Sequence, residues 1–151
     1  MFILLVDSNS FFVSVLRTIL LKAGFNSLAF ADNGLLCISA VCKDEHPDVV
    51  IIDESQCYLN GLDIIEKIRS SWPETNIIIL TGIDSDLIVD LFPDTGLMYF
   101  MDKKSITADN LPQLLYTIVT KKISSTIVPK PNKVYSSLRR SFTGMLNSIL
   151  I

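Results

Sequence analysis

Four side chains that could take part in chemistry each stand where a short apolar run of the sequence ends. They are two carboxylates, a hydroxyl and an ammonium group: Asp7, Asp53, Thr81 and Lys103. Asp53 is the clearest case, because the four aliphatic residues 49–52 before it predict a strand that is covered on both faces. An isolated ionised carboxylate is costly at the edge of a core. Its presence there indicates a reactive role for Asp53.

The apolar runs alternate with amphipathic stretches along the chain. We expect five strands, at residues 2–6, 26–30, 49–53, 76–80 and 97–101, and five helices, at residues 10–23, 34–42, 62–70, 85–92 and 111–120. Such alternation predicts an α/β fold, a doubly wound five-stranded parallel sheet flanked by five helices. Ligands of this architecture bind outside the carboxyl ends of the strands, so the four side chains should meet at one edge of the sheet.

The composition is that of one globular domain in a reducing compartment. The chain has 151 residues, of which 49% are hydrophobic and 19% charged. Its three cysteines are an odd number without a framework spacing, which favours free thiols and a cytoplasmic location. No apolar run reaches the ~18 residues that a membrane span requires, so we do not expect a membrane protein.

The charge is divided unevenly along the chain. All sixteen acidic residues lie at or before Asp109, which gives residues 1–120 a net charge of −9, whereas residues 121–151 carry +6. This boundary predicts a domain at residues 1–121, a Pro-containing linker at 122–133 and an amphipathic basic helix, or the beginning of a further domain, at 134–151. Two adjacent arginines in this tail are too small a basic cluster to indicate direct nucleic-acid binding.

Several segments resemble the receiver domain of two-component response regulators, a CheY-like, flavodoxin-like fold. The resemblance covers residues 1 to about 121 in register. The segments that carry it are "ILLVDSN", "PDVVIID", Asn60-Gly61, "IIILTG" and "YFMDK". Taken singly, Asp7 could be a helix cap and Lys103 a solvated charge, so it is the joint pattern that indicates the family.

The resemblance implies a role for each residue at the strand ends. Asp53 would be the phosphoacceptor, with Lys103 neutralising phosphoryl oxygens and Thr81 and Phe100 acting as the switch pair. Asp7, Asp53 and the backbone carbonyl of Ser55 would hold Mg²⁺. The only catalysis expected is self-phosphorylation and autodephosphorylation, so the protein is not predicted to be an enzyme in the ordinary sense.

The sequence departs from the family pattern at four positions. Ser8 stands where the family has a second metal-binding acid, which should weaken Mg²⁺ binding, and Glu54 is an alternative source of the missing charge. Cys57 replaces a usual proline after the phosphoacceptor. Lys104 replaces the proline that follows the pocket lysine, which removes an expected cis peptide bond.

Two surfaces are more apolar than a solvated surface requires. In the first helix, a core stripe is expected at Phe11, Val15, Leu16, Ile19 and Leu20. This leaves Phe12, Val13 and Leu21 on the face expected to be polar. The tail presents Leu138, Phe142 and Met145 at helical spacing. We expect the tail to dock on the first helix of its own chain or of a second copy in a homodimer; a membrane-surface helix is the alternative.

These observations predict a response regulator receiver that a sensor histidine kinase or phosphotransfer protein phosphorylates on Asp53. The alternative is a phosphorylation-independent pseudo-receiver that serves as a protein interaction module. A flavin-binding electron carrier on the same topology is a weaker third reading, because Asp7 would repel a phosphate at its phosphate-binding loop.

Overall fold

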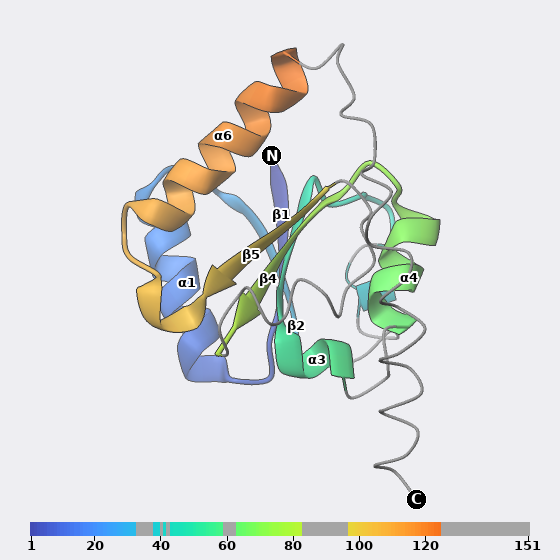
Figure 1. Cartoon of the computed structure of the whole chain (residues 1–151), viewed down its shortest axis with the longest axis horizontal. Coiled ribbons are helices and arrows are strands. Elements are labelled where there is room, and N and C mark those ends of the chain that lie inside the picture. Colours follow the sequence, from blue (N-terminus) through green and yellow to red (C-terminus); the bar gives the residue numbers. More distant parts are fainter. Residues whose placement is uncertain (33–37, 40, 42, 59–62, 83–96, 125–151) are drawn as a thin grey trace, which may run out of the picture.

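The computed structural model describes residues 1–32, 38–39, 41, 43–58, 63–82 and 97–124 of the chain. The predicted helices at 34–42 and 85–92 fall mostly or wholly outside these residues, as does the tail from residue 125 onward with Leu138, Phe142 and Met145. Figure 1 shows a central sheet with helices on both sides.

The predicted five-stranded parallel sheet is confirmed. Its strands are β1 (Phe2–Val6), β2 (Ser27–Ala31), β3 (Val49–Asp53), β4 (Asn76–Thr81) and β5 (Met98–Asp102). They lie in the order β2-β1-β3-β4-β5, and every neighbouring pair is parallel. This order reverses between β1 and β3, which is the switch point where flavodoxin-like folds bind their ligands.

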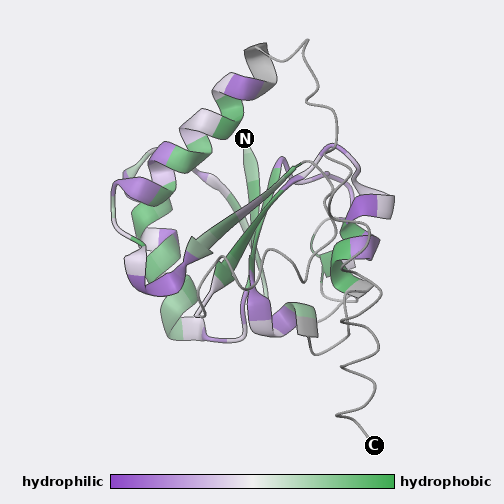
Figure 2. Ribbon diagram, viewed as in Figure 1, coloured by the Kyte–Doolittle hydropathy of each residue, from purple (hydrophilic) through white to green (hydrophobic). Residues whose placement is uncertain are grey.

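The three central strands are fully buried because helices cover both of their faces. All residues of β1, β3 and β4 are buried, whereas the edge strands β2 and β5 are only partly so. α1 (Ser10–Lys22) and α6 (Asn110–Ser124) cover one face, and α4 (Asp63–Ser71) lies against the other (Figures 1 and 2). The near-continuous aliphatic runs of the central strands are thus explained by burial on two sides.

The helix boundaries are close to those predicted, and each has a local cause. Asn9 caps α1, because its side chain accepts a hydrogen bond from the Phe12 backbone N–H at 3.1 Å. The helix ends before Gly24, whose φ of 90° is a conformation that favours glycine. α6 continues to Ser124, four residues past the predicted end of this helix at residue 120.

The face that α1 turns to the core differs from the predicted one. Leu16 and Leu20 are buried as expected, but Phe11 is 77% exposed and Val15 is exposed as well. The stripe prediction is therefore wrong for these two residues. Phe12 and Val13 are half-buried and pack against the core, while Leu21 is exposed. In a helix that is apolar nearly all round, the hydrophobic pattern alone cannot decide which side is buried.

Candidate functional site

The carboxyl ends of the central strands bring the predicted side chains to one edge of the sheet. Asp7 follows β1, Asp53 closes β3, Thr81 closes β4 and Lys103 follows β5. Asp53 pairs with Leu80 and Thr81 with Asp102 in the sheet register, so these strands end at the same level. Asp7 and Asp53 are buried, with 6% and 7% of their surface exposed, and Thr81 is fully buried.

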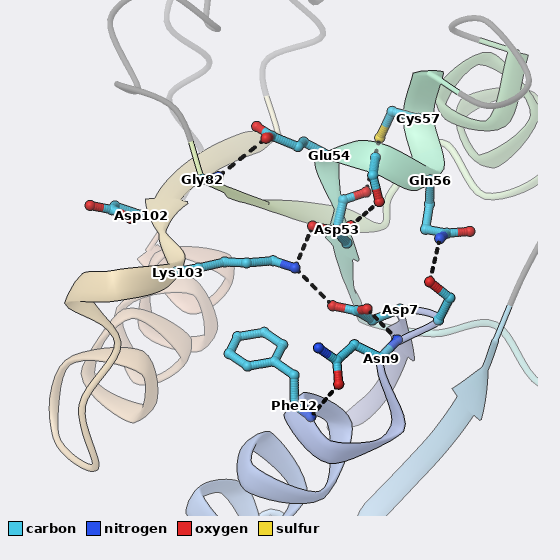
Figure 3. Close-up of polar contacts among 12 residues, drawn as sticks. Asp7, Asn9, Phe12, Asp53, Glu54, Gln56, Cys57, Gly82, Asp102 and Lys103 are labelled. Carbon is cyan, nitrogen blue, oxygen red and sulfur yellow. Dashed lines mark hydrogen bonds and ion pairs between the residues drawn. The ribbon is translucent and has the colours of Figure 1, made fainter.

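Lys103 joins the two aspartates. Its Nζ lies 2.5 Å from Asp53 Oδ1 and 3.1 Å from Asp7 Oδ2 (Figure 3). Burial lowers the pKa of this ammonium, but the hydrogen bonds and negative charges of Asp53 and Asp7 outweigh burial and leave the pKa raised. The same Nζ lies 4.8 Å from the centre of the Phe12 ring. Lys103 is thus held charged at the point where a negatively charged group would have to be neutralised.

The remaining carboxylate oxygens of the two aspartates also have donors. Asp7 Oδ1 accepts from the Asn9 backbone N–H at 2.8 Å, and Asp53 Oδ2 accepts from the Ser55 hydroxyl. Ser55 belongs to the short helix α3 (Glu54–Tyr58), which the sequence reasoning missed. Each oxygen of both aspartates therefore accepts a hydrogen bond from the protein itself.

Ser8, which stands where the resemblance implies a second acid, is paired with a neutral partner. The Ser8 hydroxyl accepts a hydrogen bond from Gln56 Nε2 at 3.2 Å, and Gln56 is only 2% exposed. Because the Gln56 amide and the Ser8 hydroxyl are both neutral, this hydrogen bond adds no negative charge beside Asp7. Gln56 was not predicted, because 48 residues of sequence separate it from Ser8 and no local pattern connects them.

Glu54 turns toward β4 rather than toward Asp7. Its Oε1 accepts from the Gly82 backbone N–H at 3.2 Å, whereas its Oε2 is buried and has no hydrogen-bond partner among the residues that the structure describes. Figure 3 shows this pair on the opposite side of Asp53 from Asp7 and Asn9. The Cys57 thiol donates to the backbone carbonyl oxygen of Asp53 at 3.7 Å. Phe100 is half-buried and packs against the core cluster beneath.

The donor set can be compared with what Mg²⁺ requires. Asp7 and Asp53 supply carboxylate oxygens, the hard donors this ion prefers. Within the described part of the chain, no group of three or more His, Cys, Asp or Glu side chains could hold a metal ion. Asp7 and Asp53 are therefore the side chains here whose oxygens would suit Mg²⁺, with carbonyl oxygens and water needed for the rest of its shell.

The strand order and this cluster of charges define a class of protein: a flavodoxin-like α/β domain with a buried carboxylate at the switch point beside a lysine. A profile of the response regulator receiver domain family matches residues 3–116. The chain therefore belongs to the receiver domain family of two-component response regulators.

Individual relatives agree with this assignment. The chemotaxis protein CheY of Thermotoga maritima is 30% identical over 87 residues, which are 58% of this chain and 72% of that protein. A putative transcriptional regulator of Pseudomonas aeruginosa is 26% identical over 113 residues, 75% of this chain and 52% of the regulator. The crystal structure of a receiver domain protein from Clostridium thermocellum is similar with a TM-score of 0.66 and 25% identity, covering 81% of this chain and 96% of that one.

A helix that crosses a lipid bilayer has to be both long and apolar. Among the residues that the structure describes, none of the helices combines the two to the degree that crossing a membrane needs.

Proposed function

We propose that this receiver is phosphorylated on Asp53 and acts as a conformational signalling switch. The observation that carries the proposal is the Lys103 ammonium, which lies within 3.1 Å of both buried aspartates. A sensor histidine kinase or a phosphotransfer protein would be the donor. The free, buried thiol of Cys57 fits the cytoplasmic location predicted for this exchange.

The positions of these groups support the following transfer. An oxygen of the Asp53 carboxylate attacks the phosphorus of a phosphohistidine, so that an O–P bond forms, the P–N bond breaks and the imidazole leaves. Lys103 neutralises charge on the phosphoryl oxygens, and the Thr81 hydroxyl donates to one of them. Bound Mg²⁺, held by Asp7, Asp53 and the Ser55 carbonyl, would supply further neutralisation of that charge. Movement of Thr81 and Phe100 would then alter the surface of β5 and α6.

The test is phosphorylation by acetyl phosphate with Mg²⁺, followed by intact-protein mass spectrometry. We expect a gain of one phosphoryl group that hydroxylamine removes, as it does from an acyl phosphate. Asp53→Asn should abolish the gain, whereas Asp109→Asn, which removes the same charge at an exposed site, should preserve it. Equal labelling of the Asp53→Asn variant would contradict the assignment of the phosphoacceptor.

A phosphorylation-independent pseudo-receiver is the second candidate. The neutral Ser8–Gln56 pair favours it, and so do the donors already bound to every oxygen of Asp7 and Asp53. Such a module would bind a partner, or a second copy of the chain, through α1 or the tail. Absence of any mass gain together with absence of Mg²⁺ binding would favour this function.

A further inference from the structure

Glu54 forms a contact that the phosphorylation chemistry described above does not use. Its carboxylate accepts the Gly82 backbone N–H, which lies one residue beyond Thr81 at the end of β4. A backbone N–H at this edge of the sheet is a donor that an incoming anion could use. Glu54 already supplies an anion to it.

The fold does not require a charge at this position. β3 and β4 are paired through five residues from Val49 to Asp53, all of them buried. The Oε2 atom of Glu54 is buried, and no residue in the described part of the chain forms a hydrogen bond with it. Burial of a carboxylate oxygen in this way costs free energy, because contact with water is lost and not replaced. A neutral acceptor would satisfy Gly82 at a lower cost. A destabilising carboxylate at Glu54, next to the proposed phosphoacceptor Asp53, indicates a functional role for Glu54.

We propose that Glu54 is an internal anion that occupies the Gly82 N–H and restrains phosphorylation of Asp53, a proposal that rests on the function given above. The two side chains are adjacent in sequence, and Figure 3 shows the Glu54–Gly82 pair directly beside Asp53. A phosphoryl group on Asp53 brings further negative charge toward Glu54. The carboxylate must therefore be displaced or tolerated at an electrostatic cost, and loading of Asp53 is slower than it would be without it.

A substitution that removes the charge of Glu54 but keeps the shape of its side chain tests whether this carboxylate slows phosphorylation. Glu54→Gln keeps a side chain that can accept from Gly82 but removes the anion. Glu74→Gln is the matched control, because Glu74 is exposed and lies before the start of β4, at the opposite end of that strand from Gly82. Both variants change the net charge by the same amount. We expect Glu54→Gln to be phosphorylated by acetyl phosphate on the order of tenfold faster than the parent, with Glu74→Gln unchanged.

The reaction is the same attack with a different donor: an Asp53 oxygen forms a new O–P bond, the O–P bond to the acetyl group of acetyl phosphate breaks, and acetate leaves. Loading of Glu54→Gln at the parent's rate overturns the inference and leaves the proposed function intact. Loading of neither protein overturns both. Phosphorylation of Glu54→Gln alone supports the inference strongly, since the Glu54 carboxylate would then prevent phosphorylation of Asp53 in the parent protein.

A second readout follows the contact itself. The amide resonance of Gly82 in a nitrogen–proton correlation spectrum should shift when Glu54 becomes glutamine and remain in place in Glu74→Gln. Because glutamine can still accept this hydrogen bond, the shift reports the loss of the charge. An unshifted Gly82 resonance in Glu54→Gln would mean that no charged carboxylate lies against this N–H, which also overturns the inference. Thermal unfolding of both variants checks that neither result reflects a loss of folded protein.

Discussion

Replacement of Lys103 with methionine should lower the free energy of unfolding by more than the replacement of an ordinary surface lysine does. The ammonium lies 2.5 Å from Asp53 and 3.1 Å from Asp7, and these carboxylate side chains are 10% and 5% exposed. Methionine has a similar length but carries no charge. The variant therefore leaves two buried carboxylates side by side without the cation between them.

The magnitude follows from the burial of the three groups. Removal of one partner from a buried ion pair typically costs about 3–5 kcal/mol, because the other charge is left unpaired. Since 26% of the Lys103 side chain is exposed, solvent screens part of this loss, and we expect about 2–3 kcal/mol. For a domain of this size the melting temperature should fall by about 10 °C.

The assay is urea unfolding at pH 7, with Lys104→Met as the control. Lys104 is the next residue and exposed, and only its backbone N–H makes a described hydrogen bond, to Asp102. Its replacement should change the free energy of unfolding by less than about 0.5 kcal/mol. Asp53→Asn should recover part of the loss in the Lys103→Met background, because it removes one of the two buried negative charges. Equal losses in the two lysine variants would refute the description of the site.

Two further predictions concern neighbouring residues. Ser8→Asp restores a third acid, so it should raise Mg²⁺ affinity about tenfold in titration calorimetry; an equal gain in Ser10→Asp, which adds the same charge at an exposed residue of α1, would count against a ligand role. Burial, and then the charges of Asp53 and Glu54, raise the pKa of Cys57 from 9.0 to about 12. The folded protein keeps this thiol proton when the unfolded chain loses it, so between pH 9 and 10 stability should fall by up to about 1.4 kcal/mol per pH unit from this group. Urea unfolding of Cys57→Ala should show a shallower decline over that range, and identical slopes would contradict the shift.

The strands and the residues at their ends could be predicted because their signals are local. A run such as Val49–Ile52 is apolar at every position, and burial on both faces of a parallel sheet is the usual cause. The parallel topology then places the residues after β1, β3, β4 and β5 at one edge. Lys103 and Asp7 are 96 residues apart, yet this rule brings them together.

Contacts between side chains from different elements could not be predicted in the same way. The Gln56–Ser8 hydrogen bond spans 48 residues, and the Gly82–Glu54 bond spans 28. Neither pair belongs to a pattern with a period. α3 was missed as well, because five residues between a strand and a longer helix carry too few apolar positions to show periodicity.

The sequence by itself determined the sheet, the order of its elements along the chain and the polar groups at its carboxyl edge. A strand that is buried on both faces is apolar at every position, so its polar residues stand at its end. Tertiary structure alone decided that Phe12 rather than Phe11 packs against the core, and that Glu54 faces Gly82 instead of Asp7. Both outcomes depend on how one element is rotated against another. That rotation is fixed by the packing of many residues at once, which no short stretch of sequence contains.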